Sequence, residues 1–132
     1  MFIAYEVSLD LIRNLRSIVP AIKKHDRDLA DQLRRAATSV SLNLGEGRRR
    51  EAGDQRRLFE IAHGSAGEVL TALEVADAWG YVIDAAAARA LLDRLLALLW
   101  RLTRGRAQLP NGRDAREVND RLAAEAKRRG QA

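Results

Sequence analysis

The chain has 132 residues, the length of one domain, and contains no cysteine, so it offers neither a disulfide framework nor a thiolate metal ligand. Its formal net charge of +5 favours an anionic partner. No apolar run approaches the ~20 residues that cross a bilayer, and residues 1–6 lack the features of a signal peptide. We therefore expect a cytoplasmic protein with no membrane association.

Four stretches carry apolar residues at three- and four-residue steps, the period of an amphipathic helix. Ser8 is the expected N-cap of the first helix, and Pro20 should kink that helix or end its regular part. Gly45 and Gly47 are expected to form the C-cap of the second helix. The predicted helices span residues 8–24, 28–45, 54–79 and 84–104.

The third predicted helix is the longest and contains Gly64 and Gly67. Each glycine costs a helix about 1 kcal/mol relative to alanine, so we expect both to allow close packing against a neighbour. Asp84 is the expected N-cap of the fourth helix, and Gly105 is expected to end it.

Amphipathic helices joined by short connections are typical of a bundle. We predict an all-α fold, an antiparallel up-down-up-down four-helix bundle, over residues 1–105. Residues 106–132 contain the turn signal Pro110-Asn111-Gly112 and few large apolar residues. We expect this second segment to be a flexible, polar, basic tail that is disordered or weakly helical.

Two motifs resemble those of one known family. The first, residues 31–47, reads Asp-Gln-Leu-Arg-Arg-Ala-Ala-Thr-Ser-Val-Ser-Leu-Asn-Leu-Gly-Glu-Gly, and the second, residues 62–69, reads Ala-His-Gly-Ser-Ala-Gly-Glu-Val. Both are similar to the four-helix-bundle family of 23S rRNA intervening-sequence proteins, and the resemblance covers about residues 5–104. One departure is Gly45, where the family usually has alanine.

The resemblance also implies an assembly and a set of partners. The same family includes the accessory variability determinant proteins of diversity-generating retroelements, which form ring-shaped homopentamers and partner a reverse transcriptase and its template RNA. The resemblance therefore implies a nucleic-acid-associated scaffold that assembles as a homo-oligomer, with a pentamer as the expected form. It leaves the subgroup of the family open.

The arginines are unevenly distributed. Residues 48–58 hold five basic and two acidic side chains, whereas residues 59–99 hold two basic and six acidic ones. In an antiparallel bundle the end of the second helix, the beginning of the third and the end of the fourth share one pole. That pole would gather Arg48, Arg49, Arg50, Arg56, Arg57, Arg101, Arg104 and Arg106. Because arginine pairs well with phosphate, we expect contacts to an RNA or DNA backbone; a merely solvated helix end is the alternative.

Four further polar residues belong to the family motifs: Arg35, Asn43, Glu46 and Glu68. They could form a binding site, but we favour a structural role. Asn43 and Glu46 lie near a helix end, where they could cap backbone groups or pair with an arginine such as Arg35. Such polar groups would fix the register of the helices.

Catalytic signals are weak. Glu60 and His63 have the Glu-x-x-His spacing of bundle metal sites, but no second pair of this kind accompanies them. Gly45-x-Gly47 lacks the remaining glycine of a dinucleotide fingerprint. The helical serines have no nearby base to activate them. We therefore expect no catalytic residue, no metal and no cofactor.

These observations favour a non-catalytic, oligomeric scaffold that binds nucleic acid. Its most specific form would be an accessory protein of a reverse transcriptase in a diversity-generating retroelement. The alternative is an assembly scaffold or protein adaptor without direct nucleic-acid contact.

Overall fold

The computed structural model describes residues 1–104 and 123–130. All regular structure within these residues is helical, which confirms the predicted all-α class. The bundle helices are α1 (Ile3–Lys23), α2 (Arg27–Gly47), α3 (Ala52–Ala78) and α4 (Ala86–Arg104). A further short helix covers residues 123–130 and is exposed throughout. The rest of the predicted tail, residues 106–122 and 131–132, lies outside the described residues.

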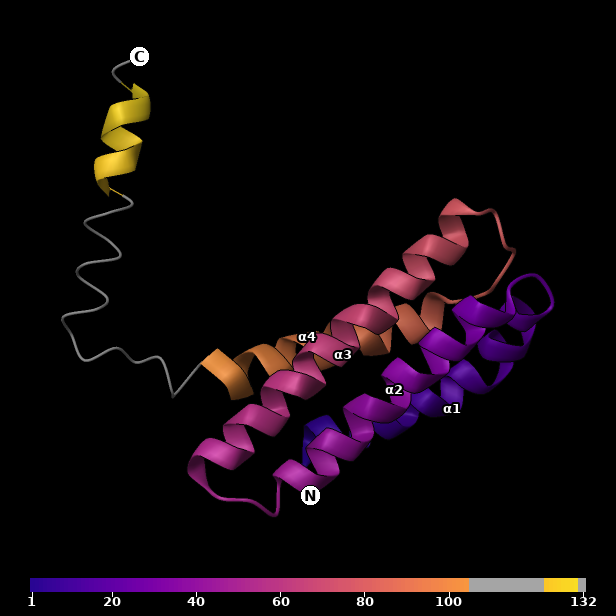
Figure 1. Ribbon diagram of the computed structural model, residues 1–132, viewed down its shortest axis with the longest axis horizontal. Coiled ribbons are helices and arrows are strands. Elements are labelled where there is room, and N and C mark those ends of the chain that lie inside the picture. The colour runs from indigo at the N-terminus through magenta and orange to yellow at the C-terminus, as the bar shows by residue number, and fades with distance from the viewer. Residues whose placement is uncertain (105–122, 131–132) are drawn as a thin grey trace.

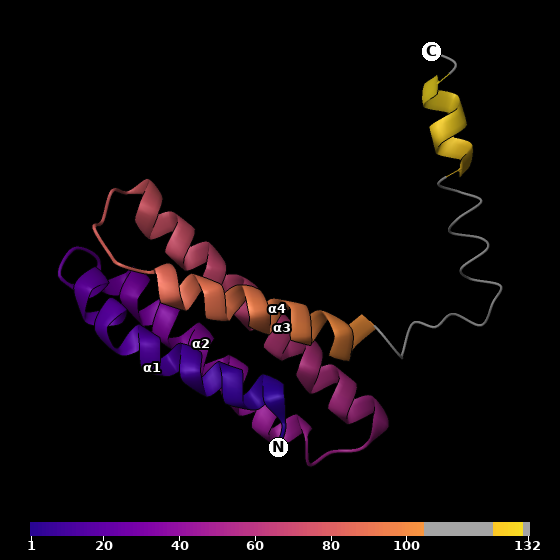
Figure 2. The same cartoon turned by 180° about the vertical axis from the view of Figure 1, so that it is seen from behind.

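The four long helices pack as a bundle. Helix α1 lies against α2 and α4, and α3 lies against the same two helices. Consecutive helices are joined by the short segments 24–26, 48–51 and 79–85. Figure 1 shows the end of α2, the beginning of α3 and the end of α4 at the same end of the bundle, and the view from behind in Figure 2 agrees. None of the helices in the described part of the chain combines the length and the apolar character that a membrane span requires.

The core forms where the four apolar stripes meet. Burying each large aliphatic side chain stabilises the fold by about 1.5–3 kcal/mol, so these stripes hold the helices together. The largest fully buried apolar side chains are Leu11, Ile22, Leu33, Val40, Leu44, Val69, Leu73, Leu92, Leu95 and Leu99.

Helix α1 begins earlier than predicted and remains regular beyond its proline. Ser8 is not an N-cap but a buried residue inside the helix, where its hydroxyl donates to the Tyr5 carbonyl at 2.6 Å and accepts from Ser41 Oγ at 2.9 Å. The helix starts at Ile3, and its buried stripe includes Ala4 and Val7, which both precede Ser8. Pro20 does not end the regular part, since the helix continues to Lys23.

Helix α2 is capped by Asp26, whose Oδ1 accepts from the Leu29 amide at 2.9 Å, so it begins at Arg27. Its predicted C-cap is wrong, because the helix runs through both glycines to Gly47. Instead, both glycines allow an aromatic side chain to pack closely against α2. A Cβ atom on Gly47 would lie 2.7 Å from Cε1 of Phe59, and one on Gly45 would lie 3.3 Å from Cε2 of Tyr5.

The glycines inside α3 do not have the role that the sequence predicts. A Cβ atom on Gly64 or Gly67 would meet no neighbouring atom of the described residues within 4 Å, so neither position requires glycine for close packing there. Gly80 is where glycine is needed, because its φ of 81° is in the left-handed region. There the Tyr81 amide donates to the Ala76 carbonyl at 3.0 Å and the Gly80 amide donates to the Asp77 carbonyl at 2.9 Å, which is a Schellman motif.

Helix α4 begins at Ala86, two residues after the predicted start. Asp84 still contributes to its cap, because its Oδ1 accepts from the Ala86 amide at 3.4 Å. Gly105, the predicted end of this helix, lies outside the described residues.

Candidate nucleic-acid interface

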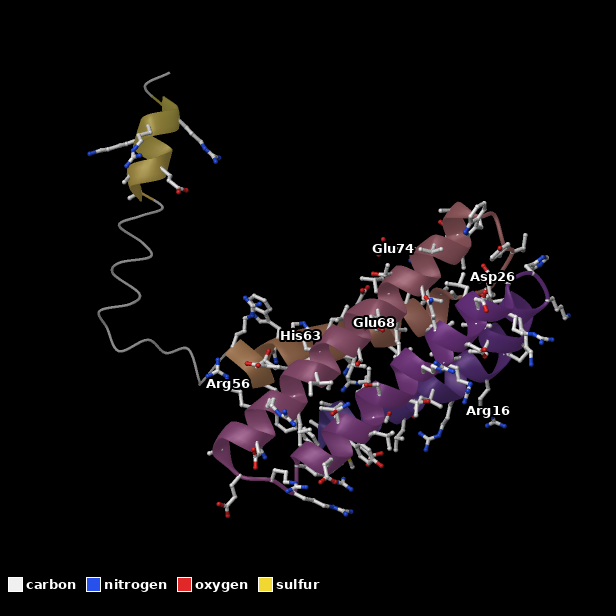
Figure 3. The ribbon with its side chains drawn as sticks, in the orientation of Figure 1. Arg16, Asp26, Arg56, His63, Glu68 and Glu74 are labelled. Carbon is white, nitrogen blue, oxygen red and sulfur yellow. The ribbon has the colours of Figure 1, made fainter. Side chains whose placement is uncertain are left out.

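Seven of the eight arginines predicted to share one pole are described by the structure, and they belong to the segment between α2 and α3, the first turns of α3 and the last turn of α4. We call them the basic pole: Arg48, Arg49, Arg50, Arg56, Arg57, Arg101 and Arg104. Figure 3 shows Arg56 on the half of α3 that lies beside the end of α4, and Asp26 at the opposite end of the bundle. Arg106, the eighth, lies outside the described residues.

The segment between α2 and α3 is held by hydrogen bonds. The Arg49 amide donates to the Glu46 carbonyl and the Arg50 amide to the Gly47 carbonyl, each at 3.1 Å. The side-chain amide of Gln55, on α3, donates to the carbonyls of Gly47 at 3.1 Å and Arg50 at 3.2 Å. The three consecutive arginines therefore project from a fixed turn.

Two arginines of the basic pole have acidic partners. Arg50 donates to Glu46 Oε1 from Nη2 at 2.6 Å and from Nε at 3.0 Å. This hydrogen bond, with the nearby negative charge, raises the pKa of Arg50 above its ordinary value. Arg56 Nε donates to Glu60 Oε1 at 3.0 Å. The side chains of both pairs are about half exposed, so these pairs add little to stability but offset part of the positive charge.

The other five arginines of the basic pole form no ion pair with any described residue. Arg48 lies over the Tyr5 ring, 4.4 Å from its centroid, and Arg104 lies over the Trp100 ring at 4.2 Å. Such stacking restrains a guanidinium without neutralising it. The remaining three lie at the surface: Arg49, Arg57 and Arg101.

The two family motifs meet at a polar cluster between α2 and α3. Asn43 Nδ2 donates to the Ser39 carbonyl at 2.8 Å and to Ser39 Oγ at 3.1 Å. The hydroxyls of Ser39 and Ser65 share a hydrogen bond of 2.8 Å across the helix interface. Asn43 was expected to be structural, but its partners were not identified from the sequence. The spacing of four residues from Ser39 to Asn43 was the available signal.

The other motif residues are arranged differently. Glu46 pairs with Arg50 and not with Arg35, because three helical turns, or about 16 Å, separate positions 35 and 46. Arg35 and Glu68 are both exposed, and neither forms a side-chain hydrogen bond or ion pair in the described part of the chain. Through its pair with Arg50, Glu46 therefore lies beside the basic pole and lowers the net charge there.

Glu60 and His63, the Glu-x-x-His pair, have separate neighbours. Glu60 accepts from Arg56, and the His63 ring meets the Trp100 ring edge-on, with centroids 6.3 Å apart and planes at 81°. Within residues 1–104 and 123–130, no three potential ligands among histidine and the acidic residues gather at one point. The contact of His63 with Trp100 instead links α3 to the end of α4.

The sequence model of the family described as 23S rRNA-intervening sequence protein matches residues 2–102. The match includes α1, α2 and α3 completely and α4 up to Leu102. It therefore includes both motifs that meet at the polar cluster between α2 and α3. No curated protein matches the chain. Because the match spans well over half of the sequence, the chain belongs to the 23S rRNA-intervening sequence protein family.

Proposed function

We propose that this chain is a non-catalytic, oligomeric scaffold of the cytoplasm that binds the phosphate backbone of RNA or DNA through its basic pole. The observation that supports this most is the group of five arginines whose charge is offset by no carboxylate of the described residues. Arginine contacts to phosphate provide affinity without reading the base sequence. Membership of a family named for rRNA intervening sequences is consistent with an RNA partner.

The more specific form of the proposal is an accessory protein that partners a reverse transcriptase and its template RNA in a diversity-generating retroelement. In this form the chain assembles as a homopentamer. An antiparallel up-down-up-down order of the helices gives every subunit one basic pole, and a ring of parallel subunits would present those poles on one rim. No metal, cofactor or catalytic residue takes part.

An adaptor without nucleic-acid contact is the second candidate, and exposed apolar side chains favour it. Leu42 is 67% exposed, and Ile61 is 42% exposed. Exposed apolar surface marks sites of protein association when it is contiguous. An adaptor would use such surface and would need no charge at the pole.

A charge-matched pair of variants separates the two candidates. The test variant carries Arg49→Ala, Arg57→Ala and Arg101→Ala, which removes positive charge while preserving both ion pairs and both cation–π contacts. The control replaces three exposed basic residues at the opposite end, Lys23, Lys24 and Arg27, with alanine. Both variants have three fewer positive charges than the parent. Any difference in binding between them therefore results from where on the bundle the charges were removed.

Binding to fluorescently labelled poly(U) of about 30 nucleotides is measured by anisotropy over a range of salt concentrations. For single strands, each arginine–phosphate pair contributes about 0.7 to the log–log salt slope, so the slope of the test variant should be smaller by about 2. The control should keep the slope of the parent. If parent, test variant and control bind alike, or none binds, the pole is only a solubility feature and the adaptor replaces the scaffold.

A further inference from the structure

We infer that Trp100 is a base-stacking residue, and that the nucleic acid bound at the basic pole is therefore single-stranded. This inference rests on the proposed function and specifies its ligand. Trp100 lies in the last turns of α4, directly before Arg101, and 51% of it is exposed.

The indole ring is held by two neighbours although it is half exposed. The Arg104 guanidinium lies 4.2 Å from its centroid, and the His63 ring of α3 meets it edge-on at 6.3 Å. Figure 3 shows His63 on the part of α3 that lies beside α4. A ring fixed in this way loses little conformational entropy when a ligand stacks on its exposed surface.

The chemistry around the ring fits one nucleotide. An exposed aromatic face stacks with an unpaired base, and arginines beside it contact the adjoining phosphates. Arg101 directly follows Trp100 in α4, and Arg104 stacks on its ring, so both can provide those contacts from the same helix. In a duplex the faces of the bases are already stacked on one another, so Trp100 could not reach them. Arginines alone would bind both forms, whereas the tryptophan favours the single strand.

The second tryptophan provides a matched control. Trp79 is 69% exposed at the end of α3, the opposite end of the bundle, and no aromatic or cationic group of the described residues stacks on it. It has the same chemistry as Trp100 and even greater exposure, but it lies away from the basic pole. Stacking that depends on the basic pole should involve Trp100 alone.

The test compares Trp100→Ala, Trp100→Phe and Trp79→Ala, using poly(U) of about 30 nucleotides and an RNA duplex of equal length. Trp100→Ala should weaken poly(U) binding on the order of tenfold and leave duplex binding and the salt slope unchanged. Trp100→Phe should restore most of the affinity, and Trp79→Ala should bind as the parent does. Equal poly(U) affinity of Trp100→Ala and the parent would overturn the inference.

A fluorescence measurement keeps the inference testable if Trp100→Ala does not fold. The chain has two tryptophans, so Trp79→Phe leaves Trp100 as the only one. Its emission should be quenched as poly(U) is added, in proportion to binding, and an unchanged emission at saturation would overturn the inference.

Two further outcomes have separate meanings. If the parent binds neither probe, the proposed function itself fails. If the parent binds but Trp100→Ala lowers the mass of the assembly in light scattering, a second copy of the chain covers Trp100, and the stacking inference alone is wrong.

Discussion

Phe59 packs directly over Gly47, so that a Cβ atom at position 47 would lie 2.7 Å from Cε1 of its ring. Phe59 is only 5% exposed, and its ring also meets that of Phe2 at a centroid distance of 5.6 Å. Through this one side chain, the beginning of α1, the end of α2 and the first turns of α3 are packed together. The arginines of the segment between α2 and α3 are therefore attached to helix ends that are packed together.

We predict that Gly47→Ala destabilises the protein by about 1–3 kcal/mol, the usual cost of overpacking a core. The ring of Phe59 is buried and has little room to move away from an added methyl group. Urea denaturation followed by circular dichroism measures the effect.

Gly64→Ala is the matched control, and its effect should have the opposite sign. Because nothing in the described part of the chain lies within 4 Å of the added Cβ atom, the helix gains up to about 1 kcal/mol of propensity without a clash. Destabilisation of similar size in both variants would show that helix context, and not the contact with Phe59, decides the result.

The hydrogen bond between Ser39 and Ser65 should couple the stabilities of α2 and α3. Ser65→Ala removes one partner of this bond and should cost about 1 kcal/mol, since Ser65 is buried. In a double-mutant cycle with Ser39→Ala, we expect a coupling energy of about 0.5–1.5 kcal/mol. A coupling energy of zero would mean that the two hydroxyls prefer water or separate backbone partners.

Tyr81 should make stability depend on alkaline pH. Its hydroxyl donates to Asp26 Oδ2 at 3.3 Å and its ring stacks on His25 at 5.0 Å. Burial, and then the charge of Asp26, raises the pKa of Tyr81. The native state thus favours the neutral phenol, so this stabilisation is complete below the unfolded pKa of about 10 and is lost as the pH rises through the folded value. The free energy of unfolding should fall less steeply above pH ~10 in Tyr81→Phe, and identical pH profiles would contradict the assignment.

We predict a homo-oligomer, with a pentamer as the expected form from the family resemblance. Exposed apolar side chains, such as Leu42 on α2, provide surface for such an assembly. Light scattering coupled to size-exclusion chromatography gives the mass, and a monomer at micromolar concentration would reject the prediction.

The helices were predictable because their apolar stripes are long and regular, but their ends were less so. Ser8 has the chemistry of a cap, but the helix starts at Ile3 and already buries Ala4 and Val7 before it reaches Ser8. Gly47 resembles a helix stop, whereas its role depends on Phe59, a contact that no local pattern reveals.

The contacts of the candidate interface were likewise predictable only where the two residues are close in the sequence. The pairing of Glu46 with Arg50 follows the four-residue rule for helices and was available from the sequence, unlike the contact of Ser39 with Ser65 across 26 positions. The stacking of Arg104 on Trp100 has the same spacing of four and could have been identified. The approach of His63 to Trp100 required the packing of α3 on α4.

The charge distribution also has a kinetic consequence. The arginines of residues 48–58 lie at one end, whereas residues 59–99, which form most of α3 and α4, hold six acidic and two basic side chains. A molecule with this asymmetry has an electric dipole, and a polyanion diffusing toward it experiences a torque as well as an attraction. Encounters would therefore be oriented before contact, with the arginine end leading. At low ionic strength, association would be faster than random collision allows, and added salt would slow it.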